Sequence, residues 1–172
     1  VWFAANMPEV TTHMVSLAST YKNDDPVLWQ RIKSEGHGAI LGVGHCSTCA
    51  PAVTTHAITL ETEYGVPVVA FHTDKFTRVA ASTARAKGLP QLPFVFVPQP
   101  VMGKTPDELR AYIEGKDSVT GAPVMQMVIE GLTQPRASSA GDIAYDETPR
   151  FVNCGTEAQL HETFRVNWWT DQ

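Results

Sequence analysis

Three short apolar runs constrain the fold of this chain more than any other feature. They cover residues 39–43, 66–71 and 93–97, and each is bounded by glycine or proline. Their apolar residues are continuous rather than alternating, which is typical of strands buried on both faces of a parallel sheet. Segments of helical length separate the runs, and this alternation predicts βαβ units. We therefore expect an α/β fold of flavodoxin-like type, with helices flanking a parallel sheet.

The segments between the runs carry the expected helices. Residues 51–64 and 76–87 have apolar side chains at helical spacing, and Gly65 and Gly88 follow them as C-terminal caps. Further helices are expected at residues 26–35, 105–114 and 124–132. The apolar residues 2–5, with the sequence WFAA, are interpreted as one more strand.

The chain divides into an α/β domain and a tail. We assign residues 1–133 to the domain and residues 134–172 to an extended tail, because proline, serine and glycine follow the last expected helix. The tail ends close to Trp168 and Trp169, and adjacent indoles rarely stay in water. We expect the tail to pack on a partner chain or a missing domain. The protein is then an oligomer or a subunit of a larger complex.

Composition excludes several classes of partner. The net charge is −5 and the 13 Lys and Arg residues are scattered, which argues against nucleic acid. No apolar stretch approaches the roughly 18 residues that a membrane span needs. The 3 cysteines do not form the dense framework of a small secreted domain, so we expect a reducing, cytoplasmic setting. We expect no bound cofactor, and a small molecule as the substrate.

The motif GHCSTC at residues 44–49 carries the chemistry. It follows the first predicted strand, and ligands of parallel α/β sheets bind beyond the carboxyl ends of the strands. The glycines allow a sharp turn, and a helix that opens at the motif stabilises a thiolate at Cys46. Thr48 or Ser47 is expected to cap that helix. The predicted substrate-binding residues of the motif are Gly44, His45, Ser47 and Thr48.

Cys46 and Cys49 admit several chemistries. A spacing of one helical turn suits redox exchange between the two sulfurs, with Cys46 as nucleophile and Cys49 as resolving thiol. A bound metal is the alternative, and its ligands would be His45, Cys46, Cys49 and His72. We expect no metal, because structural zinc needs four ligands that converge on one point. Two buried, inert cysteines are the third possibility. The role of Cys154 stays open.

The neighbouring strand ends supply further candidates. His72, Thr73 and Asp74 follow the second strand, and Gln99 follows the third. Neighbouring strands lie about 5 Å apart, so these side chains are expected at the same edge as Cys46. We expect His72 or Asp74 to assist proton transfer, and Thr73 and Gln99 to bind a small polar substrate.

Several motifs together resemble one family, the one named for its selenocysteine-Gly-Ser-Cys (UGSC) motif. They are GVGHCSTC at 42–49, HAITLE at 56–61, YGVPVV at 64–69, TDKF at 73–76, GLPQLP at 88–93 and VPQP at 97–100. The likeness spans roughly residues 38–115, within a domain-sized segment. It maps the selenocysteine or cysteine position onto Cys46 and the closing cysteine onto Cys49. Ser47 departs from the glycine that members often carry.

The resemblance implies thiol or selenol redox chemistry, through a distant likeness to the selenoprotein subunits of glycine reductase. It names no substrate. Three alternatives remain open: a racemase-like proton transfer by cysteine, a metal-binding protein, and a non-catalytic subunit of a hetero-oligomer. The racemase-like enzymes usually use a second cysteine from another part of the molecule, a role that Cys154 fills only if the tail folds back.

Overall fold

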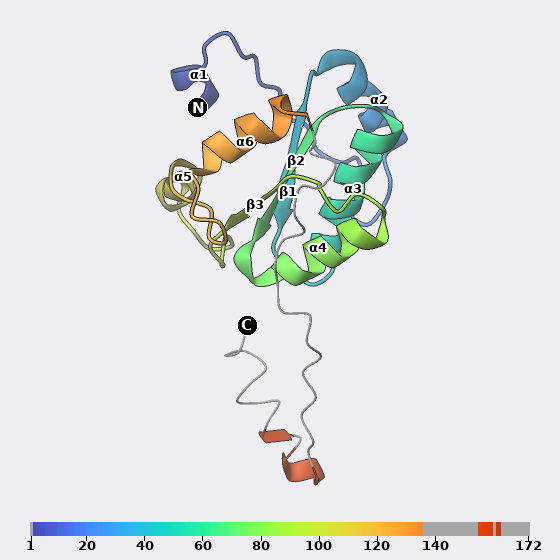
Figure 1. Ribbon diagram of the computed structural model, residues 1–172, viewed down its shortest axis with the longest axis vertical. Helices are drawn as coiled ribbons and strands as arrows, with labels where there is room; N and C mark the ends of the chain where they lie inside the picture. Colours follow the sequence, from blue (N-terminus) through green and yellow to red (C-terminus); the bar gives the residue numbers. More distant parts are fainter. Residues whose placement is uncertain (1, 136–154, 160, 163–172) are drawn as a thin grey trace.

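The computed structural model describes residues 2–135, 155–159 and 161–162 (Figure 1). The predicted tail at residues 134–172 therefore lies largely outside the described residues, as do Cys154, Trp168 and Trp169. The α/β domain is described nearly throughout.

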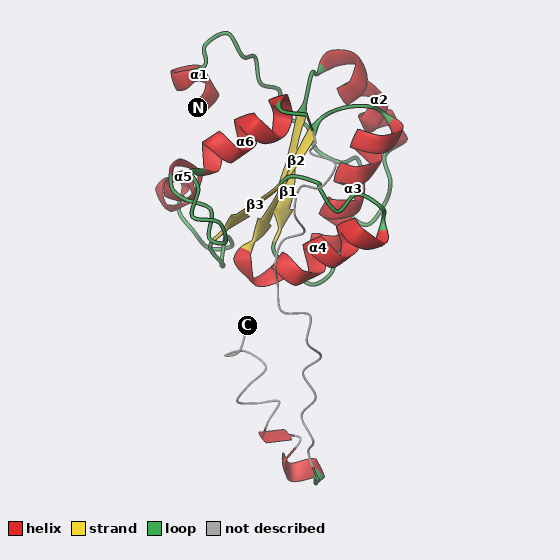
Figure 2. Cartoon of the chain, in the orientation of Figure 1, coloured by secondary structure: helices red, strands yellow, loops and turns green. Residues whose placement is uncertain are grey.

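The centre of the domain is a parallel sheet of three strands. They are β1 (Ala39–Gly44), β2 (Val68–Thr73) and β3 (Phe94–Val97), in the order β1-β2-β3. In the sheet, Ala39 is paired with Val68, and Ala70 with Phe94. All three carboxyl ends consequently lie at one edge (Figure 2). The predicted α/β fold with a parallel sheet is confirmed.

Helices cover both faces of the sheet (Figure 1). One face carries α2 (Pro26–Glu35), α3 (Cys49–Glu63) and α4 (Thr77–Ala86), which follows the short 3-10 helix η1 (Asp74–Phe76). The other face carries α1 (Trp2–Asn6), α5 (Pro106–Glu114) and α6 (Val124–Thr133). None of the helices in the described part of the chain is both long and apolar enough to cross a membrane.

The core has two halves because β2 is buried on both faces. Val68 and Ala70 pack towards α3 and α4, whereas Val69 and Phe71 pack towards α6. A continuous apolar run is therefore needed in this strand, as the sequence indicated. β1 differs, because Ile40 stays 45% exposed on this edge strand.

Helix caps that the sequence predicted are present in the structure. Gly65 and Gly88, which follow α3 and α4, have φ values of 71° and 81°, the left-handed backbone that favours glycine. Thr105 caps α5 in a capping box with Glu108, whose side chain accepts a hydrogen bond from the Thr105 amide.

The predicted strand at residues 2–5 is wrong. Trp2–Asn6 is the helix α1, and Trp2 and Phe3 pack against the half of the core that faces α6. A short apolar run has no periodicity that separates strand from helix, and contacts with the rest of the fold decide between them.

The outer edge of β3 is closed by a buried carboxylate. Asp117 is 2% exposed, and its Oδ2 accepts a hydrogen bond from the Phe96 amide. Its Oδ1 accepts from the amides of Val119 and Thr120. The Phe96 amide at the edge of β3 therefore has a hydrogen-bond acceptor within the domain.

Candidate functional site

The turn from β1 into α3 begins at two glycines that lie tightly against β2. A Cβ atom at Gly42 would lie 2.8 Å from the Cβ of Phe71, and one at Gly44 would overlap the His72 ring. Both glycines are therefore required by the neighbouring strand β2. This contact holds the end of β1, and the cysteine motif that follows it, against the carboxyl end of β2.

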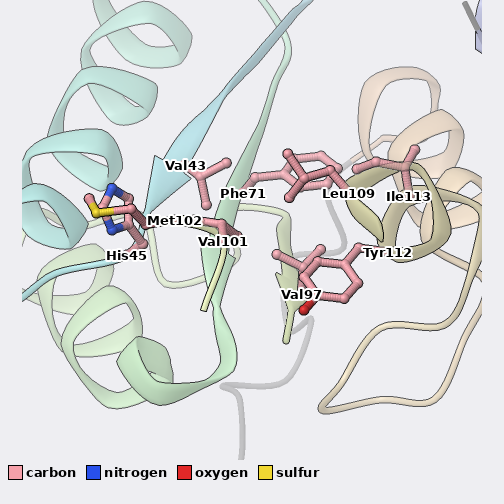
Figure 3. A pocket seen from close by; sticks show the side chains of 9 residues that line it. All are labelled: Val43, His45, Phe71, Val97, Val101, Met102, Leu109, Tyr112 and Ile113. Atoms are coloured by element: carbon pink, nitrogen blue, oxygen red, sulfur yellow. The ribbon is translucent and has the colours of Figure 1, made fainter. Parts of the chain in front are cut away.

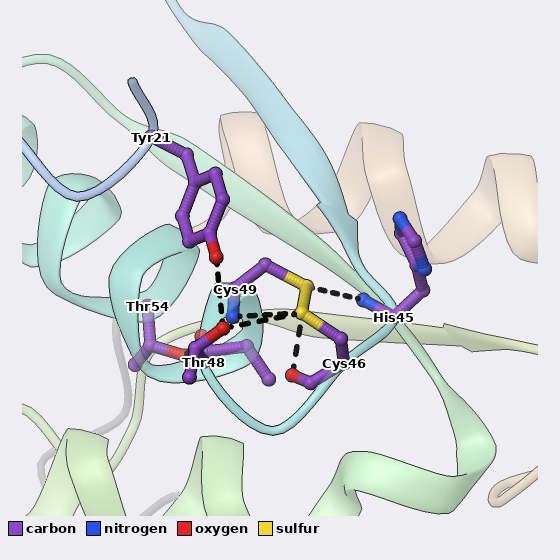
Figure 4. The surroundings of a disulfide bond; sticks show 7 residues. Tyr21, His45, Cys46, Thr48, Cys49 and Thr54 are labelled. Atoms are coloured by element: carbon purple, nitrogen blue, oxygen red, sulfur yellow. Dashed lines mark hydrogen bonds between the residues drawn. A yellow bond between two sulfur atoms is a disulfide. The ribbon is translucent and has the colours of Figure 1, made fainter.

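Cys46 and Cys49 are joined as a disulfide at the start of α3 (Figure 4). Their Cα atoms are 5.3 Å apart, across one turn of chain. Cys46 is half-buried, whereas Cys49 is buried. The resolving role that the spacing predicted for Cys49 requires this contact between the two sulfurs.

Two main-chain amides point at the sulfur atoms. The Cys49 amide donates to Cys46 Sγ at 3.1 Å, and the His45 amide donates to Cys49 Sγ at 3.2 Å. Amide donors and the positive end of a helix favour negative charge on sulfur. α3 has 15 residues and begins at Cys49. The motif therefore offers a stabilised position for a thiolate at Cys46.

The expected capping role of Thr48 is wrong. Thr48 occupies the N-cap position of α3 but makes no side-chain capping bond. The first amide of the helix, that of Cys49, instead donates to the sulfur of Cys46. The Thr48 hydroxyl lies 3.5 Å from Cys46 Sγ and 2.8 Å from the hydroxyl of Tyr21.

Tyr21 is a site residue that sequence reasoning missed. It belongs to the segment that precedes α2, and Figure 4 shows it reaching over the start of α3. Its main-chain oxygen lies 2.7 Å from Nε2 of the buried His56, and the indole of Trp29 donates to Asp24 nearby. Tyr21 and Thr48 are 27 positions apart, so no local pattern in the sequence marks this contact.

His72 is fully buried under the motif. Its Nε2 lies 3.2 Å from the hydroxyl of Thr54, which donates to the carbonyl of Ala50 in α3. Burial lowers the pKa of His72 to about 4, opposed in part by the Gly44 main chain. His72 is thus neutral at pH 7 and connects β2, the end of β1 and the first turns of α3.

The other predicted residues at the strand ends form a second group. Asp74 Oδ1 accepts a hydrogen bond from the Gln99 amide at 3.2 Å, which ties the end of β2 to the loop after β3. The side chain of Thr73 is buried, and its hydroxyl has no hydrogen-bond partner among the described residues. Ser47 is exposed beside Thr48.

The side chain of His45 points away from the two sulfurs and into a pocket (Figures 3 and 4). The pocket has a volume of about 510 Å³ and lies on the sheet face that carries α5. Apart from His45, its lining consists of apolar and aromatic side chains: Val43, Phe71, Val97, Val101, Met102, Leu109, Tyr112 and Ile113. None of these eight residues was predicted from the sequence to be part of a site.

The structure thus separates the predicted residues into three places. The two cysteines, Ser47 and Thr48 lie at the start of α3, His72 lies beneath them, and Asp74 and Gln99 lie together beyond β2 and β3. Among the described residues, no group of three or more His, Cys, Asp or Glu side chains is arranged to hold a metal ion.

Comparison with known proteins identifies a family. Residues 4–120, more than half of the chain, match the model of the UGSC family. No curated protein and no solved structure matches the chain.

Proposed function

Because this chain belongs to the UGSC family, we propose that it is a thiol-dependent oxidoreductase in which Cys46 and Cys49 exchange electrons with a small disulfide. The observation that carries the proposal is the geometry of the motif. The two sulfurs are joined, and the Cys49 amide points at Cys46 Sγ at 3.1 Å. A half-buried sulfur with an amide donor is the one suited to attack.

The reaction balances within the cysteine pair and its substrate. In the reduced protein the Cys46 thiolate attacks one sulfur of the substrate, which forms a mixed disulfide and releases one thiolate. Cys49, as a thiolate, then attacks Cys46 Sγ, which releases the second thiolate and closes the Cys46–Cys49 bond. Two electrons pass from the pair to the substrate. An external dithiol reduces the pair again.

The surrounding residues suit different roles in this reaction. Ser47 and Thr48 are exposed at the start of α3 and are proposed to contact the substrate. His72 has no exposed surface and a pKa of about 4. We assign it a positioning role, through Thr54 and the Gly44 main chain, in place of proton transfer to substrate. Asp74 is proposed to hold the Gln99 loop beside the site through their 3.2 Å hydrogen bond.

A racemase-like proton transfer is the second candidate, since the family resemblance alone does not choose between the two reactions. It needs a free thiol at Cys46 and makes no use of a bond to Cys49. The two candidates therefore differ in what Cys49 does. Incorporation of solvent deuterium into a carbon acid, with Cys49→Ser still active, would favour the racemase-like reaction.

The test is turnover with bis(2-hydroxyethyl) disulfide as substrate and dithiothreitol as reductant. We expect wild-type protein to accelerate thiol release. Cys46→Ser and Cys49→Ser should each reduce the rate by about a hundredfold or more, because each removes one of the two exchange steps. Cys154→Ser is the matched control, since it removes a thiol outside the motif, and it should retain the wild-type rate. Equal losses from all three substitutions, or from none, would contradict the proposal.

We further propose that the protein works as an oligomer or as a subunit, in a reducing compartment such as the cytoplasm. Exposed apolar side chains on the edge strand support the first part, since Ile40 and Val43 are 45% and 36% exposed. Light scattering of the purified chain tests it. A species larger than the 18.8 kDa chain is expected if the chain associates with itself, and a monodisperse monomer would contradict self-association.

A further inference from the structure

The pocket beside His45 is a second feature of the same sheet edge, and the exchange reaction does not account for it. Its walls come from the ends of all three strands and from α5 (Figure 3). Its volume of about 510 Å³ falls in the range of small-molecule sites. In parallel α/β sheets this edge is where ligands bind.

The lining selects an apolar molecule. The three strands contribute apolar side chains to the lining, including Phe71 of β2, and α5 contributes Leu109 and Ile113. Of the lining residues, Met102 is 74% exposed and Leu109 is 36% exposed. A ligand that covers these side chains removes apolar surface from water, which favours binding.

Two polar side chains line the pocket, and one of them, Tyr112, already makes a hydrogen bond. The Tyr112 hydroxyl donates to the Pro100 carbonyl at 3.4 Å. The His45 ring has no hydrogen-bond partner among the described residues. The pocket therefore offers one unengaged polar side chain within an apolar lining.

His45 also connects the pocket to the cysteine pair. Its amide donates to Cys49 Sγ at 3.2 Å, its side chain lines the pocket, and the next residue is Cys46. His45 thus contributes its main chain to the cysteine motif and its side chain to the pocket. A substrate with one arm in the pocket must therefore extend past His45 to reach Cys46 Sγ.

From this arrangement we propose, on the basis of the proposed function, that the pocket holds the apolar substituent of the substrate. The substrate class is a small disulfide with an aliphatic or aromatic group on sulfur. The sequence favoured a polar substrate because the residues at the strand ends are polar. The pocket beside them is lined by apolar side chains that were not predicted from the sequence to belong to the site.

The test compares two disulfides of the same length. Dipropyl disulfide carries a methyl group where bis(2-hydroxyethyl) disulfide carries a hydroxyl group, so the pair differs in polarity at one position of each arm. Leu109→Glu places a charge on the pocket wall. Ala111→Glu places the same charge on an exposed position of α5 outside the pocket lining, and serves as the matched control.

We expect Leu109→Glu to lower kcat/KM for dipropyl disulfide by about tenfold or more, because the propyl group of the substrate then packs against a charged carboxylate. The value for bis(2-hydroxyethyl) disulfide should fall by a clearly smaller factor, because its hydroxyl group is compatible with a nearby charge, and Ala111→Glu should leave both values within about twofold. Equal effects of Leu109→Glu on the two disulfides would overturn the inference while leaving the exchange reaction intact.

A binding measurement separates this inference from the proposed function. The Cys46→Ser/Cys49→Ser protein lacks the exchange pair, and dipropyl disulfide is titrated into it while methyl resonances are followed. Saturable shifts of the Val97, Val101 and Ile113 methyl groups are expected, and they should vanish in the Leu109→Glu background. Saturable shifts without turnover by the wild-type chain would contradict the exchange reaction, but they would still show that the pocket binds the apolar disulfide. Turnover without these shifts would refute the pocket as the substrate site.

Discussion

The imidazole of His72 lies directly against the main chain of Gly44, so that a Cβ atom on residue 44 would overlap its Nδ1 atom. The other ring nitrogen lies 3.2 Å from Thr54 in α3. A buried, neutral ring thus fills the space between two strand ends and the helix that begins with Cys49. The position of the cysteine motif depends on this packing.

Substitution of Gly44 by alanine tests that dependence. We expect Gly44→Ala to lower the free energy of unfolding by about 1–3 kcal/mol, because the added methyl group overpacks a site with no free space. His72→Ala opens that space, so its cost should be smaller in the Gly44→Ala background than in wild-type protein. Urea denaturation of the two single variants and the double variant measures this coupling. Additive costs would show that the two residues do not act on each other.

The buried His72 also predicts a pH dependence of stability. Its pKa in the folded protein is about 4, below the ordinary 6.5, because burial penalises the charged ring. The unfolded chain binds a proton as the pH falls through 6.5, whereas the folded protein does so only near pH 4. His72 therefore contributes stability above pH 6.5 that is lost progressively as the pH falls towards 4, by about 3 kcal/mol in total.

Denaturation series at several pH values measure this loss. His72→Gln keeps a hydrogen-bonding side chain without a titrating ring, and it should show a flatter dependence between pH 6.5 and 4. If wild-type protein and His72→Gln lose stability in parallel over this range, His72 is not the residue responsible.

The contact between Tyr21, Thr48 and Cys46 predicts an effect on thiol reactivity. The Thr48 hydroxyl lies between Tyr21 and Cys46 Sγ, where it can donate to a thiolate. Thr48→Val should slow alkylation of Cys46 in the reduced protein at pH 7 by about threefold or more, and Tyr21→Phe should slow it less. Thr48→Ser keeps the hydroxyl and should restore the rate. Iodoacetamide labelling with peptide mapping, repeated across pH, distinguishes this effect from a change in exposure.

The sequence predicted the sheet and the location of the cysteine pair for physical reasons. A strand covered on both faces carries a continuous apolar run, as Val68–Phe71 of β2 does, and glycines at the end of β1 mark close approach to a neighbouring strand. Helix α1 was mistaken for a strand because five residues contain too little periodicity to decide.

The remainder of the site depends on tertiary contacts that a local pattern does not contain. Tyr21 reaches Thr48 across 27 positions of chain. The α5 residues Leu109 and Ile113 were predicted to be helical, but the sequence does not say that they face the ends of β1, β2 and β3. The burial of His72 follows from the packing of α3 over β2, and it changes the role that a histidine at a strand end is expected to have.

The central claim is that Cys46 attacks and Cys49 resolves, and trapping the intermediate tests it most directly. Reduced Cys49→Ser and Cys46→Ser proteins are treated with bis(2-hydroxyethyl) disulfide, and intact mass followed by peptide mapping locates the adduct. We predict one stable mixed disulfide on Cys46 in Cys49→Ser, released by dithiothreitol, and much slower modification of Cys49 in Cys46→Ser. Equal modification of both variants, or no adduct on Cys46, would contradict the claim.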